Sequence, residues 1–133
     1  MSSRRKFIRQ SAALLAGSTV LQNWSQPLFA RNPPASQLNI AVIGAKGMGW
    51  SNTRAAMKIP GVNLVAICDV DQSVINDKMA ELQKQGINTG NISTGGDYRR
   101  LLDNKDIDII IVGTPDHWHA LQTIHALEAG KHV

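Results

Sequence analysis

Cysteine occurs only once among the 133 residues, as Cys68. A disulfide needs two cysteines, so none can form within one chain, and Cys68 lies inside an apolar run where a buried thiol is the expected state. Long apolar stretches are also scarce near the start of the chain. The uncharged segment 11–21 is too short to span a bilayer as a stable helix. The sequence therefore excludes an intrachain disulfide and a membrane-spanning helix at 11–21.

Acidic residues are absent from the first 37 positions, which hold five of the fourteen basic residues. From Leu38 onward nine basic residues face ten acidic ones, a formal net charge of −1. The overall charge of +4 therefore arises from the beginning of the chain. Nucleic-acid binding needs a basic surface on the folded part, and this part has no basic excess, so we expect no nucleic-acid partner.

The first 30 residues have the layout of a secretory signal peptide, with a charged start, the uncharged segment 11–21 and a break near Pro27. The segment SRRKFI (3–8) is similar to the twin-arginine export motif S-R-R-x-F-L-K, with Ile8 in the leucine position. A basic arm that contains paired arginines by chance is the alternative. We expect residues 1–30 to be a twin-arginine signal peptide recognised by the export machinery, residues 31–37 to be a proline-containing linker, and the protein to be periplasmic or secreted.

Strands and helices alternate from Leu38 onward. Apolar, β-branched runs predict buried strands over 38–44, 62–70 and 107–115, and Lys131 begins another. A short edge strand is expected within 87–93. Strands that alternate with helices form parallel βαβ units, and continuously apolar strands fit a sheet covered on both faces. The sequence predicts the α/β class, with a doubly wound parallel sheet (Rossmann) over 38–133.

Four helices are expected between these strands, at 48–58, 71–86, 97–103 and 116–130. Asp71 and Asp97 are candidate N-caps, and Thr114 is a candidate cap with Pro115 at the first helical position. Helical periodicity assigns an inward face to two of the helices. These faces comprise Val74, Ile75, Met79 and Leu82 in the second helix, and Ala120, Leu121, Ile124 and Leu127 in the last.

A glycine-rich turn, "IAVIGAKGMGWSN" (40–52), follows the first strand. Gly44 and Gly49 occupy the first and third positions of the dinucleotide-binding pattern G-x-G-x-x-G, but Lys46 takes the second and Gly47 follows it. Glycines permit the tight turn and the close approach of a pyrophosphate, which the free N–H groups of the next helix can bind. The loop alone fits an ordinary strand-to-helix turn equally well. The Lys46 side chain should either point away from the turn or reach the pyrophosphate as a cation.

An acidic residue, Asp69, ends the second strand 20 residues after Gly49. A carboxylate at this place can accept hydrogen bonds from the adenosine ribose hydroxyls and repel a 2′-phosphate. Capping the next helix is its alternative role, but Asp71 is better placed for that. Asp69 therefore indicates NAD rather than NADP as cofactor.

The segment GTPDHWHA (113–120) lies at the carboxyl end of a central strand, where open α/β sheets bind ligands. His117 and His119 are two residues apart and diverge by about 200° on a helix, so they cannot hold one metal ion together. No cluster of histidine, cysteine or carboxylate completes a metal site. His125 and His132 have no motif around them and are expected on the surface or in packing roles.

Four stretches, AVIGAKGMG, AICDVD, TPDHWHA and EAGKHV, together resemble the N-terminal domain of the Gfo/Idh/MocA oxidoreductase family over residues 38–133. The resemblance implies an NAD(P)-holding domain followed by an α+β domain that binds a sugar or polyol. Family members continue past G-K-H-V into E-K-P, whose lysine takes part in proton transfer. The sequence stops before that motif, so it is expected to be an N-terminal fragment, without the substrate domain, of a protein about three times as long.

The resemblance also assigns site residues. Its glycine loop corresponds to Gly44, Lys46, Gly47, Met48 and Gly49, and its ribose-binding acid to Asp69. Its T-P-x-x-x-H segment, which lines the nicotinamide end, corresponds to Thr114, Pro115 and His119. No catalytic residue is expected within the fragment.

The leading functional hypothesis is an exported NAD-dependent oxidoreductase that transfers a hydride between nicotinamide and a sugar or polyol. The full-length protein is expected to form a homo-oligomer. One alternative is a glycoside hydrolase that keeps NAD bound and oxidises its substrate transiently, as some relatives do. Another is a non-catalytic NAD-binding protein.

Overall fold

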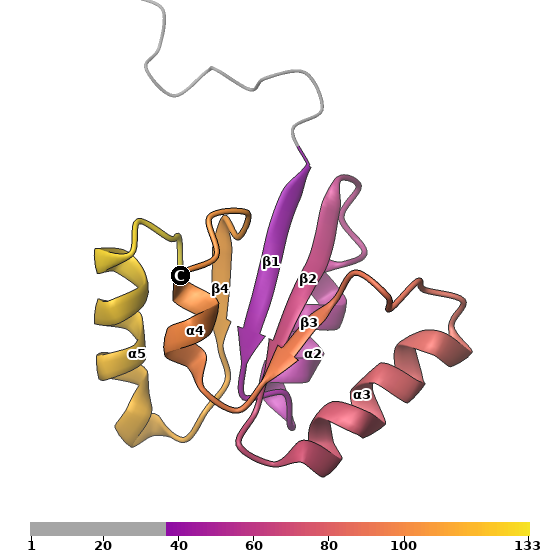
Figure 1. Ribbon diagram of the computed structural model, residues 1–133, viewed down its shortest axis with the longest axis horizontal. Coiled ribbons are helices and arrows are strands. Elements are labelled where there is room, and N and C mark those ends of the chain that lie inside the picture. The colour runs from indigo at the N-terminus through magenta and orange to yellow at the C-terminus, as the bar shows by residue number, and fades with distance from the viewer. Residues whose placement is uncertain (1–36) are drawn as a thin grey trace, which may run out of the picture. The chain divides into compact units, whose positions relative to one another are not determined.

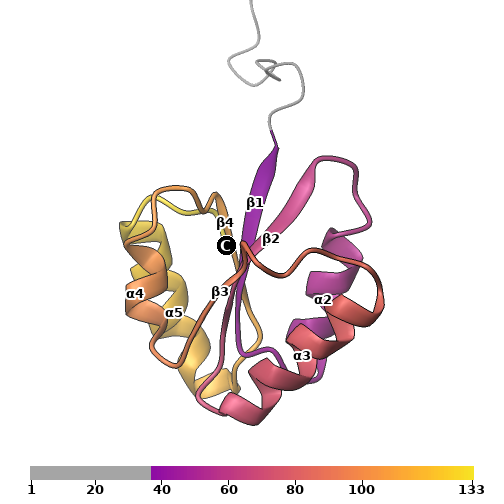
Figure 2. The same ribbon diagram turned by 45° about the vertical axis from the view of Figure 1, so that its right-hand side comes forward.

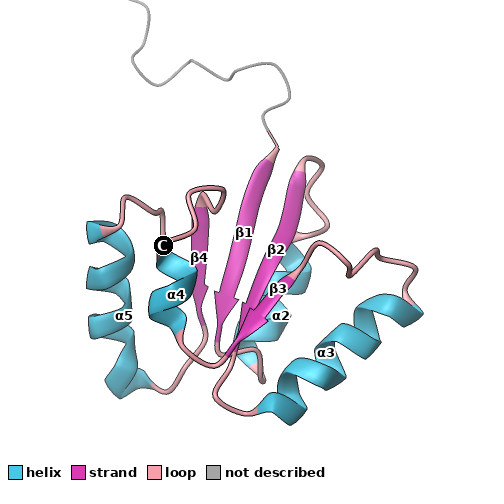
Figure 3. Ribbon diagram, viewed as in Figure 1, coloured by secondary structure: helices cyan, strands magenta, loops and turns pink. Residues whose placement is uncertain are grey.

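The computed structural model describes residues 37–133, and the expected signal peptide and nearly all of the linker lie outside these residues. Four parallel strands form one sheet in the order β3-β2-β1-β4 (Figures 1 and 3). The strands are β1 (Leu38–Ile43), β2 (Val62–Cys68), β3 (Ser93–Gly95) and β4 (Ile109–Val112). The predicted doubly wound α/β fold is confirmed.

The first strand, β1, lies between β2 and β4. From β1 the chain builds the sheet in one direction through β2 and β3, and it then crosses to the other side of β1 to form β4. Its register with β2 shifts by one residue between Ile40 and Ala41. Beyond the four strands, His132 forms a parallel bridge with Ile109 of β4. The chain thus begins a further strand beside β4, as the sequence predicts for the segment from Lys131.

Two helices cover each face of the sheet (Figure 2). The first pair is α2 (Met48–Ala56) and α3 (Gln72–Lys84), and the second pair is α4 (Tyr98–Leu102) and α5 (Asp116–Glu128). Alternate side chains of β1 enter two separate cores: Ile40 and Val42 contribute to one, and Ala41 and Ile43 to the other. Continuous apolar strands are therefore explained by burial on both faces.

Helix starts follow the sequence in two cases. The side chain of Asp71 accepts a hydrogen bond from the Ser73 N–H at the start of α3, and Asp97 accepts one from the Arg99 N–H at the start of α4. The expected edge strand exists, but it forms at Ser93–Gly95 rather than within 87–93. In this strand Ser93, Thr94 and Gly95 pair with the last three residues of β2, Ala66 to Cys68.

The predicted inward face of the last helix is wrong. Leu121, Ile124 and Leu127 are 40%, 52% and 57% exposed, whereas Gln122 and Ala126 are the buried residues of α5. Ala120, the fourth residue of the predicted face, is also exposed. Ala126 packs in the same core as Tyr98 and Ile110, because its small side chain lets α5 approach the sheet closely. In the part of the chain that the structure describes, no helix has the length and apolarity to cross a membrane.

Candidate functional site: a cavity at the carboxyl ends of the strands

Three glycines from distant segments meet at the carboxyl ends of β1 and β4. A Cβ at Gly44 would lie 2.7 Å from the carbonyl carbon of Gly113. A Cβ at Gly49 would overlap the Gly44 carbonyl oxygen and lie 2.9 Å from the Gly113 Cα. The Gly113 N–H donates to the Ile43 carbonyl at 2.7 Å and fixes this contact. Gly44 and Gly49 are therefore required for packing of the loop and of helix α2 on the sheet.

The turn between these glycines leaves the start of α2 open. Gly47, the N-cap, has a φ of 56°, in the left-handed region that glycine adopts most readily. No side chain caps α2 and no acidic residue lies in its first turn. The first N–H groups of a helix have no partner within the helix and carry its positive dipole. The turn therefore presents unpaired backbone donors at the edge of the sheet.

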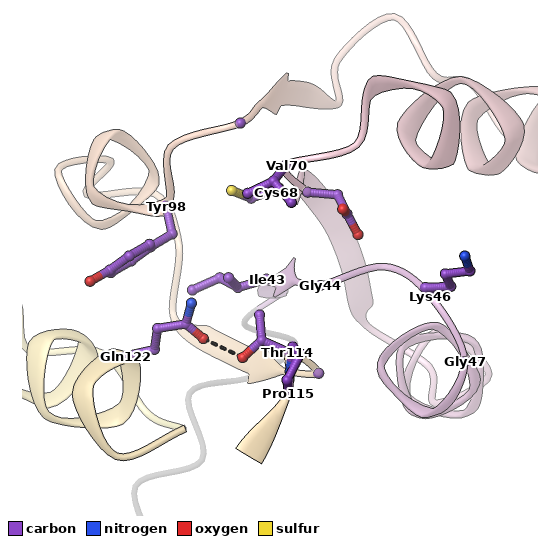
Figure 4. A pocket seen from close by; sticks show the side chains of 13 residues that line it. Ile43, Gly44, Lys46, Gly47, Cys68, Val70, Tyr98, Thr114, Pro115 and Gln122 are labelled. Carbon is purple, nitrogen blue, oxygen red and sulfur yellow. Dashed lines mark hydrogen bonds between the residues drawn. The ribbon is translucent and has the colours of Figure 1, made fainter. Parts of the chain in front are cut away.

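Lys46 occupies the place of the missing glycine with an exposed side chain. Figure 4 shows it at the rim of the cavity, with its ammonium group directed away from Thr114 and Gln122. The pKa of Asp71 lies below its usual value because the Ser73 side chain and N–H donate to the carboxylate, and the Lys46 charge contributes to the same shift. Lys46 thus adds a positive charge at the rim without filling the turn.

Asp69 joins the loop to the second strand. Its carboxylate accepts a hydrogen bond from the Ala45 N–H at 2.8 Å and another from the Asp71 N–H at 3.0 Å. Each carboxylate oxygen has two lone pairs, so both oxygens keep an acceptor site for a ligand. The side chain is half-buried, at the end of β2. Asp69 thus braces the glycine loop and can still accept hydrogen bonds from outside.

A cavity of about 490 Å³ lies between these elements (Figure 4). Six of the nine residues expected to bind the cofactor line it: Gly44, Lys46, Gly47, Asp69, Thr114 and Pro115. The other three lie elsewhere. Met48 is 71% exposed, Gly49 is buried against Gly113, and His119 hydrogen-bonds through Nε2 to the Thr114 carbonyl oxygen.

The prediction that Thr114 caps the last helix is wrong. Pro115 is the N-cap of α5, and no side chain caps that helix. The Thr114 hydroxyl instead donates to Oε1 of Gln122 at 2.6 Å, eight residues further along the chain. The loop after β4 is therefore held from both sides, by Gln122 at the hydroxyl and by His119 at the carbonyl.

Sequence reasoning missed several residues of the cavity wall: Ile43, Cys68, Val70, Gly96, Tyr98 and Gln122. Tyr98 comes from α4, and its hydroxyl lies 2.9 Å from Nδ1 of His125, whose ring stacks on the tyrosine ring. His125 thus has a packing role, as expected. No local sequence signal indicates Gln122, because its burial follows from the way α5 packs on the sheet.

The only cysteine lines the cavity as a neutral thiol. Burial raises the pKa of Cys68 to about 11, and the negative charges of Asp69 and Asp97 act in the same direction. A raised pKa means that the thiolate is scarce at neutral pH, so Cys68 contributes apolar surface rather than a nucleophile. Among residues 37–133, no three histidine, cysteine, aspartate or glutamate side chains are grouped to hold a metal ion.

A parallel sheet in this strand order, with a glycine turn after β1 and an acid after β2, defines a Rossmann-type domain. Comparison with known proteins agrees. The model of the Gfo/Idh/MocA family, described as an oxidoreductase family with an NAD-binding Rossmann fold, matches residues 38–133, and the chain belongs to this family.

Relatives of this chain include enzymes of two kinds. A glycosyl hydrolase family 109 protein from Shewanella putrefaciens is 33% identical over an alignment of 147 positions. The alignment covers 98% of this chain and 32% of the relative. An alpha-N-acetylgalactosaminidase from Shewanella oneidensis is 32% identical with the same coverage. The crystal structure of scyllo-inositol dehydrogenase from Lactobacillus casei, with bound NAD(H) and scyllo-inositol, matches with a TM-score of 0.60 and 25% identity over 74% of this chain and 27% of that one. The chain thus spans about a third of the length of these relatives.

Proposed function

We propose that this chain binds NAD and is the nucleotide-binding part of an exported enzyme that acts on a sugar or polyol. The observation that carries the proposal is the cavity itself, which has open helix N–H groups at one side and a carboxylate with free acceptor sites at the other. A dinucleotide carries both matching groups, an anionic pyrophosphate for the N–H groups and a ribose diol for the carboxylate.

The residues present fit the pyrophosphate. The open start of α2 offers backbone donors and the positive end of a helix dipole, and Lys46 adds a full charge at the rim. A Cβ at Gly47 would meet no atom within 4 Å, so space remains next to the turn for phosphate oxygens. Lys46 replaces a glycine without closing this space, because its side chain extends outward.

The residues also fit the adenosine ribose. The carboxylate of Asp69 can accept from two vicinal hydroxyls, and its negative charge disfavours a 2′-phosphate, which supports NAD over NADP. The Ala45 N–H already binds Oδ2, so the carboxylate is held in place before any ligand arrives. Such preorganisation lowers the entropy cost of binding.

Once bound, NAD supplies reversible hydride acceptance from a substrate carbon. The chain itself would supply binding and orientation: the start of α2 would hold the phosphates, the Asp69 carboxylate would hold the ribose, and Thr114 and Pro115 of the loop after β4 line the same cavity. Two fates of the hydride separate the candidate activities. A dehydrogenase would release an oxidised substrate with formation of NADH, whereas an NAD-dependent glycosidase would consume water and release the free sugar and the aglycone with no net formation of NADH.

The glycosidase is the first candidate, because relatives that match 98% of this chain are a family 109 glycosyl hydrolase and an alpha-N-acetylgalactosaminidase. The full-length protein should release p-nitrophenol from p-nitrophenyl α-N-acetylgalactosaminide with no net formation of NADH. Absorbance at 405 nm measures the p-nitrophenol, and absorbance at 340 nm measures NADH.

A dehydrogenase is the second candidate, supported by the likeness to scyllo-inositol dehydrogenase. NADH accumulating with polyols, without glycoside cleavage, would establish it. Neither product forming with broad panels of glycosides and polyols would contradict both.

Export is supported by the SRRKFI motif at residues 3–8. In a bacterial host with a twin-arginine system, the tagged full-length protein should accumulate in the periplasm. Changing Arg4 and Arg5 together to lysine should retain it in the cytoplasm, because the export receptor reads the arginine pair. A change of Arg31 to lysine, outside the motif, is the control. Equal periplasmic amounts for all three proteins would refute the export proposal.

A further inference from the structure

Gln122 is a polar side chain buried against the cavity. It is 4% exposed, although it comes from α5, whose apolar residues Leu121 and Ile124 are largely exposed. It lines both the main cavity and an adjoining recess of about 330 Å³. Burying an amide requires hydrogen bonds to compensate for lost water, so the position of each amide atom matters.

The amide of Gln122 has one defined orientation. The Thr114 hydroxyl donates to Oε1, which places Nε2 on the opposite side of the group. Figure 4 shows this nitrogen directed into the cavity, away from Thr114. Within residues 37–133, no hydrogen bond from Nε2 is present, although an amide nitrogen carries two donors. Among the described residues no buried side-chain nitrogen or oxygen lacks a hydrogen-bond partner, so Nε2 is accessible from the cavity. The cavity therefore contains an accessible amide donor, held by the contact of Oε1 with Thr114.

The recess beside this donor has walls suited to a flat heterocycle. Tyr98, Pro115 and Trp118 contribute ring surfaces, and Val70 extends into the open with 94% exposure. Val70 directly follows Asp69, so a ribose bound at Asp69 has its base next to Val70. The recess also has four polar or charged lining residues, Asp97, Arg99, Thr114 and Gln122, of which Gln122 is the buried one. Aromatic and aliphatic walls with a few polar groups are typical of sites that bind one face and one edge of a ring.

We infer that Gln122 recognises the adenine of NAD by donating a hydrogen bond from Nε2 to one of its ring nitrogens, with the base held in the recess. The inference rests on the proposed function. It places Thr114 and Pro115 beside the adenine, whereas the family resemblance assigns them to the nicotinamide end. Adenine presents ring nitrogens as in-plane acceptors, and glutamine amides donate to them in other recognition settings. Thr114 acts as a positioning residue, because in this structure its hydroxyl binds Oε1 and leaves Nε2 toward the base.

The test compares AMP with its 1-deaza, 3-deaza and 7-deaza analogues, each of which lacks one ring acceptor. Binding to the full-length protein is measured by calorimetry. One of the three analogues should bind about five- to tenfold more weakly than AMP, as expected for one lost hydrogen bond. In Gln122→Met the same analogue and AMP should bind equally, because the donor is absent. A role in packing alone would lower all four affinities together and leave their ratios unchanged.

Two further variants complete the design. Gln122→Glu keeps an acceptor for the Thr114 hydroxyl but removes the donor, so it should abolish the discrimination even if Gln122→Met does not fold. Gln85→Met, at an exposed glutamine of the loop after α3, should keep it. Equal binding of AMP and all three analogues to the wild type, or discrimination that persists in Gln122→Glu, would overturn the inference while leaving NAD binding intact. Failure of the wild type to bind both AMP and NAD would instead overturn the proposed function, and the inference with it.

Discussion

Gly49→Ala should lower the free energy of unfolding by about 2 kcal/mol. The added Cβ would overlap the Gly44 carbonyl oxygen and press on the Gly113 Cα, and both are backbone atoms that cannot rotate away. Overpacking of this kind costs about 3 kcal/mol. Alanine gains about 1 kcal/mol of helix propensity over glycine, which offsets only part of that cost. Urea unfolding of the full-length protein, followed by circular dichroism and by intrinsic tryptophan fluorescence, measures the change.

The control for this prediction is Gly95→Ala. Gly95 ends β3, a Cβ there would meet no atom within 4 Å, and its φ lies outside the left-handed region. Its stability should stay within about 1 kcal/mol of the wild type. Gly113→Ala should behave like Gly49→Ala, because its Cβ would press on the Gly49 backbone from the other side. Equal stability of Gly49→Ala and Gly95→Ala would show that α2 is not held by this contact.

Asp69→Asn should weaken NAD binding by about 30- to 100-fold. The substitution removes the anion that accepts from the Ala45 N–H and that would accept from the ribose, and hydrogen bonds to charged groups contribute about 1.5–3 kcal/mol each. NADP should lose much less affinity, because the carboxylate no longer repels its 2′-phosphate. Titration calorimetry with both cofactors measures the two dissociation constants and their ratio.

An exposed carboxylate on α3, Asp77, provides the matched control. Asp77→Asn removes the same charge from the same side of the sheet without touching the cavity lining, so both affinities should stay within about twofold of the wild type. A change in the NAD affinity of Asp69→Asn no larger than that of Asp77→Asn would remove Asp69 from the ribose site. Loss of affinity for NAD and NADP by the same factor would limit its role to bracing the loop.

The strands were predictable because their side chains are buried on both faces. Ile40 and Val42 alternate with Ala41 and Ile43 between two cores, so no polar residue interrupts the run. The caps at Asp71 and Asp97 were predictable for a local reason, since a short carboxylate reaches the N–H two residues ahead. In both cases the determining interaction depends on neighbours in sequence or on simple burial.

The inward face of α5 was not predictable by the same reasoning. The periodicity of its large apolar residues indicates a face, but it does not indicate which face meets the sheet. Small Ala126 and hydrogen-bonded Gln122 pack inward, while Ile124 and Leu127 lie outward. Close helix packing favours small side chains, which a count of large apolar residues gives little weight.

The candidate site also contains some residues that the sequence identifies and others that only the fold brings into place. Gly44 and Asp69 were found because they belong to a motif with fixed spacing along the chain. The Thr114 hydroxyl was assigned to a cap, because Gln122 approaches it only after α5 has formed. Tyr98 reaches the cavity from α4, on a segment that no motif marks. Wall residues contributed by separate elements depend on the fold itself and not on local sequence.

The central position of β1 has a consequence for how the protein acquires its structure. β1 is made first, but it pairs with β4, whose residues follow about 70 positions later, as in the register of Ile40 with Ile109. A nascent chain that ends before β4 leaves one edge of β1 unpaired, with its backbone N–H and C=O groups open to other strands. The pairing of β1 with β4 can therefore form only after β4 has been made, and contacts this distant in sequence make folding slow. The interval between translation of β1 and of β4 is when this domain is most exposed to aggregation.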